Sequence, residues 1–184
     1  MADPVATTER LVLRPWREED YADWSRHLNT AQVRAHIGGQ LPAERARSTF
    51  ERLLTTWPTK GYGMIAMVRR RDDMLLGACG CGPMTDHATP AEMRGGYDIG
   101  YQLRVDMWGR GYATEAAGAA LDLIFDRMGQ DVAWGRTSEA NAASGAVFRR
   151  LGMTLRPDLD YDDPDYEPAE NPTQVWMMRR EDRP

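Results

Sequence analysis

The sequence predicts an α+β (mixed α/β) fold in a single domain covering 1–184, and three observations support this. The chain has 184 residues, which is long enough for one domain with a full core and short for two. Apolar residues form 42% of it, as in globular proteins. Segments with alternating apolar residues and segments of helical period follow one another, and several strands are adjacent in sequence, which favours hairpins in the middle of the chain.

The chain begins with a strand and two helices. Leu11 and Leu13 alternate with Val12 in ERLVLRPW, which predicts the strand. The first helix is expected in REEDYADWSRHLN, where acidic residues occupy the first turn. The second helix is expected in LPAERARSTFERLLTTWP, opened by Pro42 and closed near Pro58.

Strands dominate the rest of the chain. Three of them are expected next, at 63–69, 74–81 and 96–103. A helix over 114–128, a strand in VAWGRTS, a short helix in NAASGAVFRRLGM that Gly152 ends, and a last strand in TQVWMMRR follow. The acidic segment at about 156–172 shows neither period, so we expect an irregular loop, either solvated or forming a docking surface for a basic partner.

Charge and hydropathy exclude several classes of protein. The formal net charge is −5, which argues against non-specific binding to nucleic acid and permits amine-bearing partners. No apolar run is long enough for a membrane span. The start, MADPVATTER, has no basic patch followed by an apolar stretch, so we expect no secretory signal and a cytoplasmic protein without membrane partners.

The two cysteines predict neither a disulfide nor a metal site. Cys79 and Cys81 lie two residues apart in an expected strand, where they share one face with poor geometry for a disulfide. The three histidines form no ligand pattern with them. We therefore expect buried thiols and no bound metal.

A glycine turn precedes the 114–128 helix. Gly109 and Gly111 expose bare backbone where a helix N-terminus has unpaired N–H groups that bind anions; an ordinary tight loop is the alternative. A Walker loop would need Gly-Lys-Ser/Thr, which is absent, and the dinucleotide pattern would need a third glycine where Thr114 stands.

A different pattern fits the glycine turn. WGRGYATEA resembles the acyl-CoA-binding motif of the GNAT acetyltransferases, Gln/Arg-x-x-Gly-x-Gly/Ala, with Gly111 and Ala113 at its small positions and Trp108 where the superfamily has Gln or Arg. DIGYQLRVDMWGRGYATEA, TERLVLRP and NAASGAVFRRLGM are similar to the Rim-type branch, which acetylates the N-termini of ribosomal proteins. The resemblance covers about 8–180 and is strongest over 97–153.

The resemblance implies a fold, a coenzyme and an acceptor. The fold would be a mostly antiparallel twisted sheet of about six to seven strands with one splayed strand pair, flanked by about four helices. Acetyl-CoA would be the co-substrate, without a metal, and the acceptor would be a protein N-terminus or a small-molecule amine. The protein would be a monomer or homodimer. Residues assigned by this resemblance to coenzyme binding are Leu103, Val105, Trp108, Gly109, Arg110, Gly111, Tyr112, Ala113, Thr114, Asn141 and Phe148.

Two residues are candidates for the chemistry. Asp98 stands where the family usually has Glu and would act as the base, through a relaying water because Asp is shorter; a structural acid in the sheet is the alternative. Ser144 stands where the Rim-type branch has its proposed acid; a bond back to a helix carbonyl is the alternative. Asn141 would also suit a helix N-cap. Phe148 lacks the hydroxyl of the tyrosine common at its position, so a non-catalytic acyl-CoA-binding or sensing domain is the second hypothesis.

Overall fold

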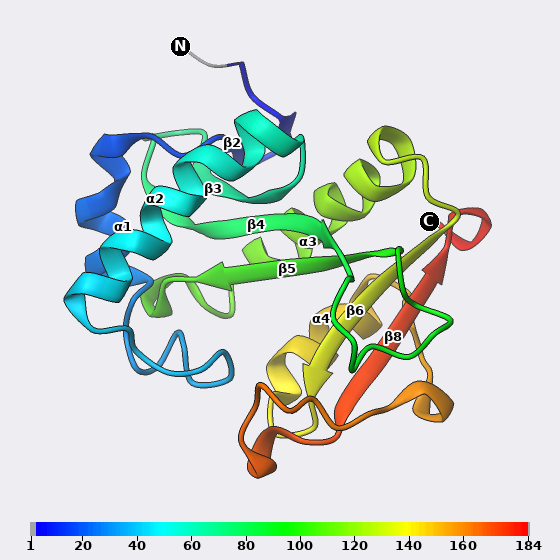
Figure 1. Cartoon of the computed structure of the whole chain (residues 1–184). Coiled ribbons are helices and arrows are strands. Elements are labelled where there is room, and N and C mark those ends of the chain that lie inside the picture. Colours follow the sequence, from blue (N-terminus) through cyan, green and yellow to red (C-terminus); the bar gives the residue numbers. More distant parts are fainter. Residues whose placement is uncertain (1–2, 184) are drawn as a thin grey trace. The chain divides into compact units, whose positions relative to one another are not determined.

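The computed structural model describes residues 3–183, which form two compact units, each built from two chain segments. Unit 1 contains the chain up to Gly80 together with Gly100–Ala119. Unit 2 contains Cys81–Ile99 and the chain from Ala120 onward. Figure 1 labels the longer helices and strands of each unit.

Eight strands occur in the described part of the chain, in the sheet order β1-β2-β3-β4-β5-β6-β8-β7. They are β1 (Ala6–Thr7), β2 (Leu11–Arg14), β3 (Gly63–Arg69), β4 (Leu75–Pro83), β5 (Tyr97–Leu103), β6 (Val132–Ser138), β7 (Thr154–Leu155) and β8 (Thr173–Arg179). The pairs β1–β2, β2–β3, β6–β8 and β7–β8 are antiparallel, and β5–β6 is parallel. The prediction of an α+β fold with a mostly antiparallel sheet is therefore confirmed. It has more strands than expected because β1 and β7 are too short to show a sequence period.

Residues 3–183 contain four α-helices, as expected. They are α1 (Tyr21–His27), α2 (Ala43–Lys60), α3 (Tyr112–Asp122) and α4 (Ala142–Arg150). Two boundaries differ from the sequence prediction. The α2 helix passes through Pro58 and ends at Gly61, whose φ of 74° allows its N–H to reach Trp57 O at 2.9 Å. The predicted 114–128 helix begins earlier and continues beyond α3 as a π-helical segment, Leu123–Arg127.

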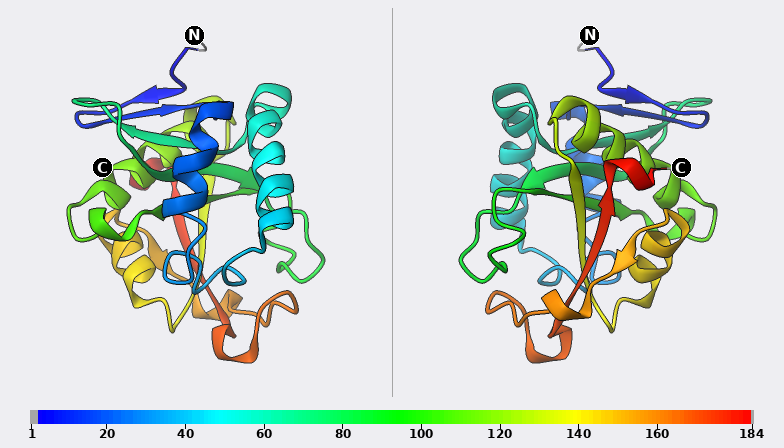
Figure 2. Two further views of the ribbon diagram at one scale, coloured as in Figure 1. Left: turned by 90° about the vertical axis from the view of Figure 1, so that its left-hand side faces the viewer. Right: turned by 90° about the vertical axis from the view of Figure 1, so that its right-hand side faces the viewer.

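In unit 1, α1 and α2 cover one face of the sheet (Figure 2). Trp24 of α1 and Phe50 of α2 meet with ring centroids 5.4 Å apart, and Trp16 lies 5.6 Å from Phe50. These rings pack against Ala66 and Val68 of β3. This aromatic layer stabilises unit 1, because each buried ring removes a large apolar area from water.

In unit 2, β6 and β8 run side by side over seven paired residues, from Val132↔Arg179 to Ser138↔Thr173 (Figure 1). Phe148 of α4 packs on this ladder with 1% of its surface exposed. A Cβ on Gly135 would lie 2.8 Å from the tip of the Phe148 ring, so glycine is needed there. The register of β5 with β6 covers Tyr97–Ile99, and the predicted splaying beyond it stays a prediction.

The acidic loop is irregular, as predicted, but it is anchored to unit 2 rather than free in solvent. Tyr161 forms an isolated bridge with Thr173. Asp163 is 8% exposed, and its N–H donates to Asn171 Oδ1 at 2.9 Å. The Ser138 hydroxyl donates to Glu170 Oε2. These contacts fix the side chains that the loop presents to the neighbouring strands.

Both cysteines are buried, and neither forms a disulfide, as predicted. In residues 3–183, no group of three or more His, Cys, Asp and Glu side chains is placed to hold a metal ion. The same residues contain no helix whose length and hydropathy would suit a membrane span.

Candidate active site

The glycine turn lies in unit 1, directly before α3. Gly109 and Gly111 have φ values of 71° and 79°, which glycine adopts without strain. Trp108 N–H donates to Val105 O at 3.1 Å, so its amide is already used and the predicted donor set loses it. The N–H groups of residues 109–114 have no acceptor within the described chain. Several converging N–H groups at a helix N-terminus can bind an anion.

Arg10 and Glu115 brace this turn, and sequence analysis missed both. Glu115 Oε1 accepts hydrogen bonds from Arg10 N at 2.8 Å and Thr8 Oγ1 at 2.6 Å, and Oε2 pairs with Arg10 Nε at 2.6 Å. Arg10 Nη1 also donates to Arg110 O at 3.0 Å, and the guanidinium lies 4.6 Å from the Tyr112 ring centroid. Burial raises the pKa of the Glu115 carboxyl, but the Thr8 and Arg10 hydrogen bonds outweigh it, so this pKa is lowered and Glu115 stays ionised.

The other predicted coenzyme contacts of unit 1 lie on the approach to the turn. Leu103 is buried at the end of β5, whereas Val105, Trp108 and Arg110 are exposed. The Trp108 indole N–H donates to Leu103 O at 2.9 Å, which uses one lone pair of that carbonyl. Pairing of a coenzyme with the Leu103 and Val105 backbone stays a prediction.

Asp98 lies in unit 2, on β5, and forms an ion pair with Arg136 of β6. Arg136 Nε donates to Asp98 Oδ2 at 2.7 Å. The side chain of Asp98 is 20% exposed and that of Arg136 is 26% exposed. Parallel pairing sets Asp98 opposite Trp134, so Asp98 and Arg136 come from neighbouring positions on adjacent strands. Both charges are partly removed from water but remain within reach of a ligand.

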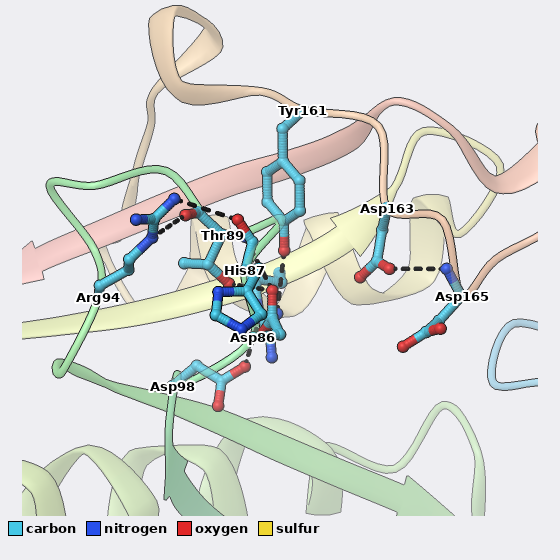
Figure 3. A network of polar contacts seen from close by, with 9 residues as sticks. Asp86, His87, Thr89, Arg94, Asp98, Tyr161, Asp163 and Asp165 are labelled. Carbon is cyan, nitrogen blue, oxygen red and sulfur yellow. Dashed lines mark hydrogen bonds and ion pairs between the residues drawn. The ribbon is translucent and has the colours of Figure 1, made fainter.

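Two further side chains, Tyr161 and Asp86, which are labelled in Figure 3, hold the Arg136 guanidinium. Arg136 Nη1 donates to Tyr161 Oη at 2.9 Å and lies 3.4 Å from Asp86 Oδ2. Asp86 Oδ1 in turn accepts from Thr89 N at 2.8 Å and from Thr89 Oγ1 at 2.5 Å. Tyr161 comes from the acidic loop and directs its hydroxyl toward the side of the sheet where Asp86 and Asp98 lie. Four chain segments therefore build one polar network.

The two acids of this network have opposite pKa shifts. Burial raises the pKa of the Asp98 carboxyl and outweighs the charge and hydrogen bond of Arg136, which lower it. Burial also raises the pKa of Asp86, but the Thr89 hydrogen bonds and the Arg136 charge dominate, so the net shift is downward. Burial and the Asp98 charge raise the pKa of the Cys81 thiol to about 12, so it stays protonated. Asp98 is thus the more basic acid, and Asp86 serves as a fixed anion.

The α4 residues have defined positions in unit 2. Asn141 is the N-cap of α4, and its Oδ1 accepts from Ser144 N at 3.2 Å. Ser144 is partly buried, and Phe148 lies in the core against Gly135 and Trp176. The N-cap prediction for Asn141 is confirmed, whereas coenzyme contact by Asn141 and Phe148 and the acid role of Ser144 stay predictions.

The predicted site residues divide between the units. Leu103 to Thr114 lie in unit 1, and Asp98, Asn141, Ser144 and Phe148 lie in unit 2. A family model described as the acetyltransferase (GNAT) domain matches residues 10–154. The chain belongs to the GNAT acetyltransferases. The observed α+β architecture is the one that this family has.

The chain is also similar to individual proteins. YkkB of Bacillus subtilis, an uncharacterized protein, is 33% identical over 152 residues that cover 79% of this chain and 83% of that protein. The crystal structure of an acetyltransferase from Agrobacterium tumefaciens is 25% identical with a TM-score of 0.77, covering 98% of this chain and 96% of that one. RimL, a ribosomal L7/L12 α-N-protein acetyltransferase in complex with coenzyme A, shares the fold, with a TM-score of 0.74, 16% identity and coverage of 96% and 98%.

Proposed function

We propose that this GNAT protein transfers the acetyl group of acetyl-CoA directly to a primary amine in a ternary complex. The acceptor is a protein N-terminal α-amine, as in the Rim-type branch, or a small-molecule amine. The observation that carries the proposal is the glycine turn, where the amides of residues 109–114 have no acceptor within the described chain. Together with the start of α3, they suit the diphosphate of coenzyme A.

The residues of unit 1 would hold the diphosphate. The amides of Gly109 to Thr114 would donate to its oxygens, and the positive end of the α3 dipole would favour the charge. The exposed Arg110 adds positive charge beside the turn, whereas the charge of Arg10 is offset by its ion pair with Glu115. Leu103 and Val105 would pair with the pantetheine arm. The family resemblance also assigns coenzyme contact to Asn141 and Phe148.

Acetyl transfer removes one proton from the amine nitrogen and replaces the C–S bond of the thioester with a C–N bond. The neutral amine nitrogen attacks the thioester carbonyl carbon, the new C–N bond forms, and the C–S bond breaks. Asp98, whose pKa is raised by burial, takes the proton that the nitrogen loses, through a water where the carboxylate is too short. Ser144 or solvent supplies a proton to the departing thiolate. An α-amine, with a pKa of about 7.7 to 8.0 against roughly 10.4 for lysine, needs less help from this base.

Three attributes stay predictions beside the activity: one domain over 1–184, a cytoplasmic location, and a monomeric or homodimeric state. The second candidate function is a non-catalytic acyl-CoA-binding or sensing domain. Phe148 favours it, because this buried ring has no hydroxyl to protonate a thiolate. Tight binding of coenzyme A without transfer to any amine would select this second function.

The test of the activity is release of free thiol from acetyl-CoA with a panel of amines, followed by mass spectrometry of the acceptors. The panel contains basic peptides with free N-termini, N-acetylated peptides with one lysine, polyamines and amino sugars. We expect thiol release with at least one class, and an acceptor mass increased by one acetyl group. Absence of both turnover and coenzyme A binding would contradict the proposal.

The glycine turn makes a separate prediction about binding. Gly111→Ala places a Cβ 3.3 Å from Arg10 Nη2, at a φ of 79° that alanine disfavours, and on the surface that the diphosphate would touch. We expect its Kd for coenzyme A to rise by about 5- to 30-fold, measured by calorimetry. Gly38→Ala is the matched control, since Gly38 has a φ of 82° with no atom within 4 Å. Equal Kd values for the two variants would exclude this turn as the binding site.

A further inference from the structure

We propose that Arg136 recognises a carbonyl group adjacent to the acceptor amine, so that this enzyme selects α-amino carbonyl compounds such as peptide N-termini and amino-acid amides. This inference rests on the proposed acetyl transfer and on Asp98 as its base. It assigns Arg136 a role in acceptor specificity.

One arm of the Arg136 guanidinium is unused. Nε donates to Asp98 and Nη1 to Tyr161 and Asp86, whereas Nη2 has no acceptor in residues 3–183. A guanidinium carries five N–H donors in a planar fork, and Nε and Nη2 lie on the same edge of that fork. A carbonyl oxygen bound at Nη2 would therefore lie directly beside the Asp98 carboxylate. The Arg136 side chain is 26% exposed, so part of it remains in contact with solvent.

A donor and a carboxylate that lie side by side suit an α-amino carbonyl unit. In such a compound, only the α-carbon and the carbonyl carbon separate the amine nitrogen from the carbonyl oxygen. The amine would face Asp98, which receives its proton, while the oxygen accepts from Arg136 Nη2. Amines with no neighbouring carbonyl, such as lysine side chains, polyamines and amino sugars, would leave this donor unused and gain nothing from it.

The network also fixes Arg136 and balances its charge. Tyr161 and Asp86 hold Nη1, and Asp86 is itself anchored by two hydrogen bonds from Thr89. A ligand would therefore bind an arginine that has already lost its conformational freedom, which reduces the entropic cost of recognition. The charges of Asp86 and Asp98 offset that of Arg136, so a protonated amine can approach without net repulsion.

The test compares two acceptors that differ in one group. Alaninamide has the carbonyl beside its amine, and isopropylamine has a methyl group in place of the carboxamide. We expect Arg136→Gln to lower the ratio of kcat/KM for alaninamide to that for isopropylamine by about 10- to 100-fold relative to the unaltered enzyme, because a charged hydrogen bond is lost. The difference between the pKa values of the two amines is the same for every enzyme variant. A change at Asp98 affects the reaction of both amines. Both effects therefore cancel when the ratios of the variants are compared.

Arg156→Gln is the matched control, because Arg156 also joins two carboxylates in unit 2, Asp158 at 2.7 Å and Glu92 at 3.2 Å, and is 24% exposed. Its acceptor ratio should equal that of the unaltered enzyme. Arg136→Lys keeps the charge but not the fork, so it should also lower the ratio, and it replaces the glutamine variant if that protein does not fold.

The outcomes separate the two proposals. An unchanged ratio in the Arg136 variants, or equal use of both amines by the unaltered enzyme, would overturn the role of Arg136 and leave acetyl transfer standing. Absence of turnover with every amine of the wider panel would instead overturn the proposed function. A peptide bearing both a free N-terminus and a lysine gives an independent result: acetylation of the lysine alone would contradict the inference.

Discussion

Asp98→Asn is expected to lower kcat/KM for acetyl transfer by about 10²- to 10⁴-fold, the range that general-base catalysis supplies. Asparagine keeps the shape of the side chain and a hydrogen bond from Arg136 Nε, but it cannot take the proton of the attacking amine. The measurement is the initial rate of thiol release at saturating acetyl-CoA with the best acceptor. Binding of coenzyme A should be unchanged, which separates a chemical defect from a folding defect.

The pH profile gives the same prediction a second readout. Burial raises the pKa of Asp98, and a base acts in its ionised form, so activity should fall as the pH decreases through that raised pKa, above the ordinary value of about 3.9. In Asp98→Asn this fall in activity should disappear, and only protonation of the acceptor amine should lower the activity at acid pH. Because its folded pKa is raised, Asp98 contributes stability that is present below its unfolded pKa and lost as the pH rises through its folded pKa.

Asp122→Asn is the matched control for Asp98. Burial raises the pKa of Asp122 also, and Asp122 pairs with Arg183 at 2.8 Å. This variant should retain kcat/KM and the step of the pH profile that belongs to Asp98. If Asp98→Asn instead keeps full activity with an unaltered pH profile, Asp98 is a structural acid of the sheet.

Gly77→Ala should cause a large loss of stability. A Cβ at Gly77 would overlap the carbonyl oxygen of Gln102, and would lie 3.0 Å from that carbonyl carbon and 3.1 Å from Leu103 Cα. These are backbone atoms of β5, which cannot rotate away as a side chain can. Relief would require the strands to separate within unit 1, so we expect the free energy of unfolding to fall by about 3 kcal/mol, measured by urea denaturation.

Gly82→Ala is the control for this effect, since Gly82 lies in the same strand, β4, with no atom within 4 Å of an added Cβ. Its free energy of unfolding should change by no more than about 0.5 kcal/mol. Equal urea midpoints for the two variants would show that β4 and β5 have more freedom in unit 1 than their close approach indicates.

The periodicity of apolar residues was sufficient to predict the long helices and strands. Leu11 and Leu13 are fully buried, as their alternation predicts, and Gly152 has the positive φ of a helix end. The end of α2 was wrong because Pro58 lies in the last turn, where it removes only one hydrogen bond near an end that Gly61 caps. Strands of two residues, such as β7, are too short for an alternation of apolar and polar residues to be recognised in the sequence.

The site was harder to predict than the fold. Asp98 was found by its family position, but its partner Arg136 lies 38 residues away, and Tyr161 is a further 25 residues along the chain. Such polar contacts leave no local pattern. One signal was available: Arg136 is the only charged residue in VAWGRTS, and a charge within a buried strand requires a partner of opposite sign.

The division of each unit into two chain segments has a consequence for how the protein is made. The chain leaves unit 1 at Gly80 and resumes it at Gly100, and unit 2 obtains β8 from Thr173–Arg179. During synthesis, β6 therefore has no antiparallel neighbour until Thr173–Arg179 has been translated. A nascent chain halted before Thr173 would keep one edge of β6 unpaired, which is an open template for aggregation.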